Sequence, residues 1–136
     1  MNCLGHIRIL PDKSRREQTA AEHCRQTAEY AAQCLKGIGL ATPGYLAGLL
    51  HDLGKFQGAY QDYIERAAGG EAVKRGSVIH TFQGCRLLLE EYDGETPDLY
   101  EDLTSELLTF AVGAHHGLFD CVDERRSSGV LHRLSA

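Results

Sequence analysis

The sequence lacks the features of an exported, membrane-spanning or disulfide-built protein. It has no tryptophan, one methionine and three prolines, and its five cysteines include no C-x-x-C pair. An odd number of cysteines without that spacing argues against a disulfide framework and against a thiolate zinc site. No long apolar segment opens the chain, and the best apolar run, residues 45–50, is much too short to cross a bilayer. We therefore expect a cytoplasmic protein with reduced cysteines and no membrane partner.

The sequence also lacks an excess of positive charge. Its 14 Lys and Arg residues stand against 19 Asp and Glu residues, which gives a formal net charge of -5. Bulk electrostatics therefore provides no affinity for nucleic acid, and a phosphate substrate would need a local positive feature. The length of 136 residues, with 43% hydrophobic and 24% charged side chains, is that of one folded domain covering residues 1–136.

Helical periodicity dominates the chain from about residue 19 onward. An apolar stripe with helical spacing starts at His23 and continues through Thr27, Tyr30, Ala31, Cys34, Leu35 and Ile38. Further amphipathic segments cover about residues 57–68 and 78–92. No segment alternates with a period of two for long enough to predict a strand.

Two Thr-Pro pairs predict the starts of two further helices. Thr42 with Pro43, and Thr96 with Pro97, have the residue types of an N-cap followed by the first helical position. The helix after Pro43 is expected to stop near Gly54, and the helix after Pro97 near Gly117. The predicted fold is all-α, with about five helices.

What the sequence has in excess is histidine, the commonest metal ligand among side chains. Five histidines fall within or at the edge of predicted helices, whereas His6 and His132 lie near the termini; the five are His23, His51, His80, His115 and His116. Taken singly, a satisfied core histidine or a helix-end residue explains most of these positions. Together they occupy four predicted helices and are flanked by small residues that allow close approach, namely Gly48, Gly84, Gly113 and Gly117. That combination is typical of a polydentate site between helices.

The segment from His51 to Lys55 contains three side chains that could take part in catalysis. Asp52 follows His51 directly, and Lys55 shares their helix face if the last turn holds. Imidazole nitrogen and carboxylate oxygen suit divalent transition metals, and a site without cysteine leaves positions for water and substrate. A capping role for the His51–Asp52 pair, and a helix-dipole role for Lys55, remain alternatives.

The order of these motifs resembles the HD superfamily of metal-dependent phosphohydrolases, and most of all the HD nuclease domain of type I CRISPR-associated systems. The similarity spans about residues 22–120. The matching residues are an early His23, the H-D-x-G-K run of residues 51–55 followed by Tyr60 and Gln61, the segment HTFQGC from His80, and AHHG from Ala114.

The resemblance implies a helical HD-domain bundle that cleaves phosphodiester bonds, chiefly in single-stranded DNA, during CRISPR interference against viruses. It implies one or two divalent ions, Mn²⁺ or Mg²⁺ in the first place, with Ni²⁺, Co²⁺, Fe²⁺ and Zn²⁺ as alternatives. The implied ligands are His23, His51 and a bridging Asp52 for one ion, and His80, His115 and His116 for the other. Asp52 and Lys55 would be the catalytic residues, with Lys55 beside the scissile phosphate. The implied partners are single-stranded DNA, a CRISPR helicase domain or subunit, and the RNA-guided effector complex.

One part of the family pattern is not found. The pattern includes a late Asp, on a helix well downstream of the paired histidines, that completes the first metal site. Only Asp120 and Asp123 follow His116 here, and neither can be equated with that residue on sequence grounds. The first site is then incomplete, filled by water, or served by residues outside this chain. We expect a C-terminally truncated fragment or a naturally shortened domain.

Two other functions fit the same motifs. An HD phosphohydrolase acting on nucleotides or cyclic nucleotides is one, although four Phe and no Trp provide no evident base-binding cluster. A catalytically incomplete HD module that binds metal or a protein partner is the other, and the missing late Asp favours it. Metal content, and hydrolysis of small nucleotides compared with DNA, distinguish the three.

Overall fold

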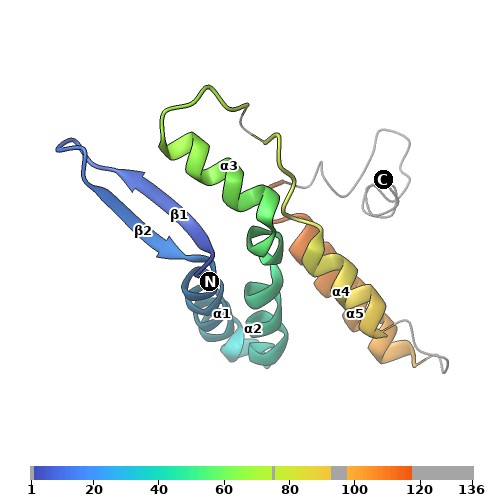
Figure 1. The fold of residues 1–136 in the computed structure, drawn as a ribbon. Coiled ribbons are helices and arrows are strands. Elements are labelled where there is room, and N and C mark those ends of the chain that lie inside the picture. The colour runs from blue at the N-terminus through green and yellow to red at the C-terminus, as the bar shows by residue number, and fades with distance from the viewer. Residues whose placement is uncertain (1, 75, 93–97, 118–136) are drawn as a thin grey trace.

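The computed structural model of the chain describes residues 2–74, 76–92 and 98–117. Within these residues it is mostly helical, with five α-helices and one small sheet (Figure 1). The prediction of a helical fold with about five helices is confirmed. The elements in chain order are β1 (Leu4–Ile9), β2 (Arg15–Thr19), α1 (Ala20–Leu35), the 3-10 turn η1 (Lys36–Ile38), α2 (Ala41–Leu50), the 3-10 turn η2 (Leu53–Phe56), α3 (Gly58–Ala68), α4 (Gln83–Tyr92) and α5 (Leu99–Gly113).

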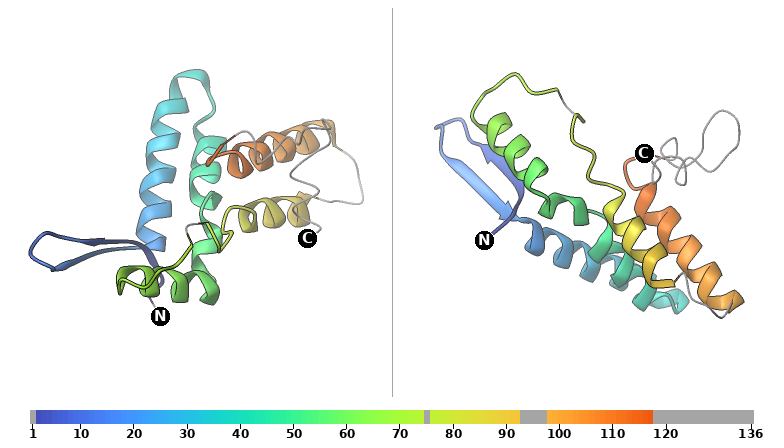
Figure 2. Two further views of the ribbon diagram at one scale, coloured as in Figure 1. Left: turned by 90° about the horizontal axis from the view of Figure 1, so that it is seen from above. Right: turned by 45° about the vertical axis from the view of Figure 1, so that its right-hand side comes forward.

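The N-terminal hairpin is a small addition to this helical fold that the sequence did not predict. β1 and β2 pair antiparallel, with His6 opposite Gln18 and Arg8 opposite Arg16. Figure 2 (left) shows the hairpin extending sideways from the start of α1. Gly5 is the only residue of β1 that is buried, and β2 buries none. Because neither strand has an apolar face packed on a core, the alternation that predicts strands is weak here.

The helix starts follow local capping, but not always at the predicted residues. Thr19 caps α1, because its side chain accepts a hydrogen bond of 3.1 Å from the backbone N of Glu22. α2 begins at Ala41, so the predicted cap at Thr42 is wrong. Pro43 lies in the first turn of that helix, where its missing N–H has no helical partner to lose.

The later helices are shorter than predicted. α4 begins at Gln83 rather than near residue 78, so His80 lies in a loop. Thr96 and Pro97 lie outside the described residues, and Asp98 caps α5 by accepting a 2.8 Å hydrogen bond from the backbone N of Tyr100. α5 ends at Gly113, before the predicted stop at Gly117.

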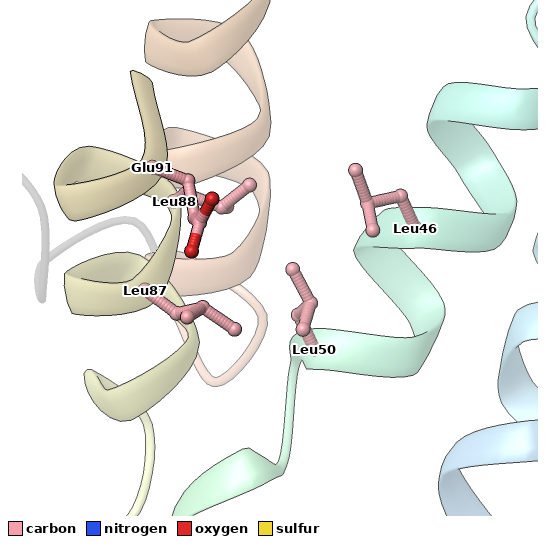
Figure 3. A pocket seen from close by; sticks show the side chains of 5 residues that line it. All are labelled: Leu46, Leu50, Leu87, Leu88 and Glu91. Carbon is pink, nitrogen blue, oxygen red and sulfur yellow. The ribbon is translucent and has the colours of Figure 1, made fainter. Parts of the chain in front are cut away.

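The core lies where α2, α4 and α5 meet. Its buried residues are Leu50, Phe82, Cys85, Leu88, Leu108 and Val112. An open groove between α2 and α4 borders this core, with leucines from both helices facing each other and Glu91 beside them (Figure 3). None of the helices in the described part of the chain is long and apolar enough to cross a membrane.

Two of the four glycines singled out in the sequence, Gly48 and Gly84, allow the helices to approach closely, whereas no atom lies within 4 Å of a Cβ at Gly117. A Cβ on Gly48 of α2 would lie 2.6 Å from Ala28 Cα of α1, and a Cβ on Gly84 of α4 would lie 2.3 Å from the Leu50 carbonyl oxygen. Any larger side chain at either position would therefore force the backbones apart. These two close contacts hold α1, α2 and α4 together, and these helices carry or adjoin His23, His51 and His80.

Candidate metal centre

Asp52 stands at the junction where α2 gives way to η2. The α-helix ends at Leu50, earlier than the predicted stop at Gly54, and the chain continues as a 3-10 turn. The Asp52 carboxylate and the Lys55 ammonium are both buried, with relative exposures of 3% and 4%. Their atoms Oδ2 and Nζ lie 2.8 Å apart. The last α-helical turn on which the predicted shared face depended does not form, and a 3-10 turn brings the two side chains together instead.

Histidines from four other places surround this carboxylate. His23 of α1 places Nε2 3.0 Å from Asp52 Oδ2, and the neighbouring His51 places Nε2 3.1 Å from the same oxygen. On the other oxygen, Oδ1, His80 Nε2 lies at 3.5 Å and His115 Nε2 at 3.4 Å. The structure therefore brings these predicted residues together around one acid.

His116, the last of the predicted ligands, contacts His80. Its Nε2 lies 3.2 Å from His80 Nε2. The ligand atoms of Asp52, His80 and His116 all lie within 4.8 Å of one another, as one metal ion requires. Asp120 and Asp123, the two aspartates that follow His116 in the sequence, lie outside the described residues.

Backbone carbonyls orient three of these imidazoles. His80 Nδ1 lies 3.4 Å from the Val78 carbonyl oxygen, and the other two contacts are shorter. His51 Nδ1 lies 2.7 Å from the Gly48 carbonyl oxygen, and His115 Nδ1 lies 2.6 Å from the Val112 carbonyl oxygen. A carbonyl only accepts, so Nδ1 carries the proton in both rings, and a neutral ring then has its lone pair on Nε2. Both Nε2 atoms face Asp52, which is the orientation of metal-ligating histidines.

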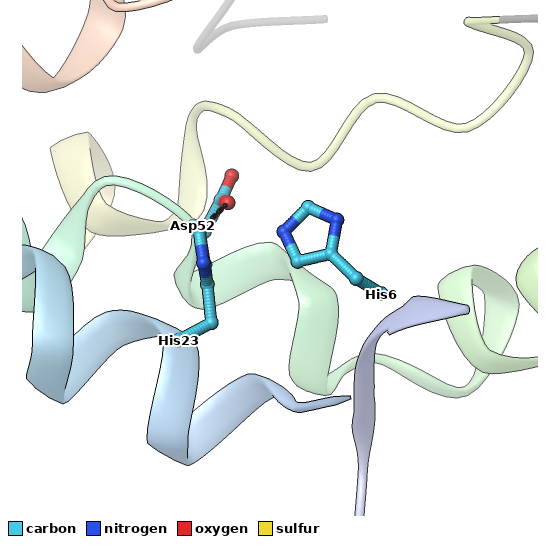
Figure 4. Close-up of side chains that lie close together, drawn as sticks. All are labelled: His6, His23 and Asp52. Atoms are coloured by element: carbon cyan, nitrogen blue, oxygen red, sulfur yellow. Dashed lines mark hydrogen bonds and ion pairs between the residues drawn. The ribbon is translucent and has the colours of Figure 1, made fainter. Parts of the chain in front are cut away.

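Sequence reasoning missed His6. β1 brings this residue to the site, where His6 Nε2 lies 3.1 Å from Lys55 Nζ. The ligand atoms of His6, His23 and Asp52 also lie within 4.8 Å of one another (Figure 4). The one available signal was the alternation of His6 and Arg8 with Ile7 and Ile9 in a segment that the prediction left without a strand.

Asp52 is held ionised by its neighbours. Burial by itself opposes the charged form of Asp52. The polar contacts with His115 and His51, together with the hydrogen bond and charge of Lys55, outweigh this effect and hold the pKa of Asp52 well below its usual range. The same burial and the Asp52 charge raise the pKa of Tyr60 to about 12.

Most of the surrounding imidazoles are held neutral. Burial, followed by the charge of Lys55, lowers the pKa of His23 from 6.5 to about 4. Burial also lowers the pKa of His6, His80 and His116. Burial works against protonation of His115 as well, but Asp52 reverses the effect and raises its pKa. A neutral imidazole is the form that binds a metal ion.

Two buried atoms indicate what the cluster is built to hold. Asp52 Oδ1 and His115 Nε2 are buried without a hydrogen-bond partner, because their 3.4 Å contact lacks hydrogen-bond geometry. Leaving such atoms unpaired costs roughly 1–3 kcal/mol each. Their lone pairs converge with those of other imidazoles on the same carboxylate, and a divalent cation would satisfy them together. The residues therefore fit a metal ion.

The comparison with family models agrees with this geometry. The HD domain matches residues 20–127, which is most of the chain and includes every predicted ligand. The chain belongs to the HD-domain family, whose members are generally metal-dependent hydrolases of phosphate esters. None of the curated proteins and none of the solved structures matches the chain significantly.

Proposed function

We propose that this HD domain is a metal-dependent nuclease that cleaves single-stranded DNA in CRISPR interference. The observation that supports it best is the position of Lys55, whose buried ammonium lies 2.8 Å from the central carboxylate. A phosphodiester at such a site would meet an ammonium group as well as bound cations. The ordered motifs around residues 51–55 and the paired His115 and His116 provide the further support.

The two oxygens of Asp52 divide the cluster into two ligand groups. Oδ2 faces His23 and His51, whereas Oδ1 faces His80 and His115. We propose that the first group holds one ion, that His80, His115 and His116 hold a second, and that Asp52 bridges them. Mn²⁺ or Mg²⁺ is the proposed metal. A divalent ion bound here would activate water and offset the charge of the phosphodiester.

Lys55 has the second catalytic role in this proposal. Its ammonium donates to Asp52 Oδ2 and cannot accept, so it presents a fixed positive charge beside the metal ligands. That charge would stabilise the phosphoryl oxygens as negative charge grows on them in the transition state. Together with the bound ions, Lys55 supplies the local positive field that a chain of net charge -5 otherwise lacks.

The proposed partners follow from the same reading. Single-stranded DNA is the substrate, supplied by a CRISPR helicase domain or subunit at a target bound by the RNA-guided effector complex. A second candidate is the hydrolysis of nucleotides or cyclic nucleotides, which the same ligand set would support.

The test is a cleavage assay on protein stripped of metal and reloaded with Mn²⁺ or Mg²⁺. Labelled single-stranded DNA, duplex DNA and cyclic nucleotides are offered in parallel. We expect metal-dependent cutting of the single strand, its abolition in Asp52→Ala, and a loss of about 100-fold in Lys55→Met with metal still bound.

The matched control is Asp62→Ala, which removes an exposed carboxylate from α3. Its cleavage rate should equal that of the wild type. Faster hydrolysis of a cyclic nucleotide than of DNA would transfer the function to the second candidate. Bound metal without hydrolysis of any substrate would instead favour a binding module.

A further inference from the structure

We propose that His6 is an additional ligand of the ion that His23 and Asp52 would hold, and that Gln61 is the positioning residue that places it there. This inference rests on the metal-binding part of the proposed function and not on the choice of DNA as substrate. His6 precedes residues 20–127, so the family match does not assign it.

The geometry of His6 is that of a ligand. The ligand atoms of His6, His23 and Asp52 lie within 4.8 Å of one another. His6 Nε2 lies 3.1 Å from Lys55 Nζ, and since an ammonium only donates, this nitrogen carries a lone pair, which accepts from Lys55 in the metal-free protein and would be given to the ion instead. The His6 and His23 rings meet edge to face with their centroids 4.5 Å apart. The His6 side chain is exposed whereas Asp52 is buried, so His6 closes the site from the solvent side.

A single amide ties β1 to the centre. Gln61 Oε1 accepts a 2.7 Å hydrogen bond from the backbone N of Leu4, and Gln61 Nε2 donates to the Leu4 carbonyl oxygen at 2.9 Å. The same Nε2 donates to the Lys55 carbonyl oxygen at 2.6 Å. One side chain of α3 thus fixes the strand two residues before His6 and the turn that carries Lys55.

The neighbouring Tyr60 strengthens this attachment. Its hydroxyl donates to the Gly5 carbonyl oxygen at 3.4 Å, and Gly5 packs so closely on Ala20 that a Cβ would lie 3.0 Å from Ala20 Cα. The strand register is irregular between Leu4 and His6, and such irregularities re-aim side chains. The Tyr60–Gln61 pair, noted in the sequence without a role, therefore has one.

An additional imidazole here would supply a ligand to the first metal site, which lacks the late Asp of the family pattern. The first ligand group contains His23, His51 and one oxygen of Asp52. His6 would add a fourth protein ligand, and it would come from the strand β1 and not from a helix. The N-terminal hairpin is then part of the metal centre.

The experiment measures metal binding directly. Mn²⁺ and Zn²⁺ are titrated by calorimetry into metal-free wild type, His6→Asn, Gln61→Ala and the double variant. We expect each single variant to weaken one ion by about 10- to 100-fold. The double variant should bind like His6→Asn alone, because Gln61 acts through His6. The control Gln33→Ala, at an exposed position of α1 several turns after His23, should bind like the wild type.

A spectroscopic readout separates a ligand from a structural residue. In protein labelled with ¹⁵N-histidine, Zn²⁺ should shift the Nε2 resonance of His6 together with that of His23. An unmoved His6 resonance, or unchanged affinity in a folded His6→Asn, overturns the ligand assignment. Additive losses in the double variant overturn the positioning role of Gln61. A wild type that binds no ion overturns this inference and the proposed function together, whereas bound ions without DNA cleavage overturn the nuclease alone.

Discussion

At the scale of single residues, the centre is a carboxylate with more neighbours than it can satisfy. Asp52 meets four imidazoles and one ammonium within 3.5 Å. Of those five groups, the Lys55 ammonium has donors only. An imidazole in its neutral form has one N–H and one nitrogen lone pair. The cluster therefore has several lone pairs that a cation could bind. Without a cation, the protonation of the imidazoles should influence the stability of the protein.

The pH dependence of that stability has a defined sign. The pKa of His23 lies at about 4 in the folded protein, below its ordinary value of 6.5. The unfolded chain therefore takes up protons first as the pH falls, and the free energy of unfolding decreases from about pH 6.5 toward about pH 4. The lowered pKa values of His6, His80 and His116 act in the same direction, whereas the raised pKa of His115 opposes them.

Urea denaturation of metal-free protein between about pH 7 and pH 4.5 measures this effect. We expect the denaturation midpoint to fall steadily with pH, and the slope to be smaller in His23→Gln. Arg25→Gln, on the exposed side of the same helix, serves as the control and should retain the wild-type slope. A midpoint that rises on acidification would contradict the assignment of neutral imidazoles.

At the scale of elements, close backbone contacts hold the ligand-bearing segments in place. His80 lies in the loop before α4, and the backbone of His80 packs directly on Gly54 of η2. A Cβ on Gly54 would lie 2.2 Å from the His80 carbonyl oxygen and 2.6 Å from His80 Cα. The glycine of the H-D-x-G-K run therefore lets the second ligand group approach the first.

Gly54→Ala should consequently separate the two ligand groups. We expect a loss of about 1–3 kcal/mol in the free energy of unfolding, as for other overpacked sites. We also expect weaker binding of the ion that His80 would hold. Denaturation and metal titration of the variant measure the two effects. Gly58→Ala is the matched control, since no atom lies within 4 Å of a Cβ at that position, and a Gly54→Ala as stable as this control would refute the packing argument.

At the scale of the whole molecule, the centre collects residues from the N-terminal hairpin and from the helices in one place. Its residues come from β1, α1, the α2–η2 junction, the loop before α4 and the segment that follows α5. The main buried cluster involves α2, α4 and α5 but not the hairpin. α1 already packs closely on α2 at Gly48. A bound ion would therefore add a further connection between the hairpin and the helical part of the domain.

Metal removal should destabilise the protein as a unit. An ion at 100 times its dissociation constant adds about 2.7 kcal/mol to the free energy of unfolding. We expect a rise in melting temperature on the order of 10 °C on addition of Mn²⁺, reversed by a chelator. Scanning calorimetry measures the shift. Asp52→Ala should show none, and equal melting temperatures with and without metal in the wild type would contradict a metal centre.

The sequence by itself determined the helical class and most of the site. Helical periodicity predicted the helices to within about five residues, although the predicted cap at Thr42 was wrong. The motifs identified Asp52, Lys55 and five of the histidines, because these signals are local in the chain. The division of His51, Asp52 and Lys55 between a helix end and a 3-10 turn depended on packing against the loop around His80.

Only the tertiary structure decided the place of His6 and the role of Gln61. Their partners lie 49 and 57 residues away in sequence, in elements whose pairing no local pattern encodes. The hairpin has no apolar face, and its sequence therefore shows little of the alternation that predicts strands. Hydrogen bonds from Gln61 of α3 attach it to the rest of the domain. Local sequence patterns therefore determined the helices and the histidine motifs, whereas long-range polar contacts determined how the hairpin joins the centre.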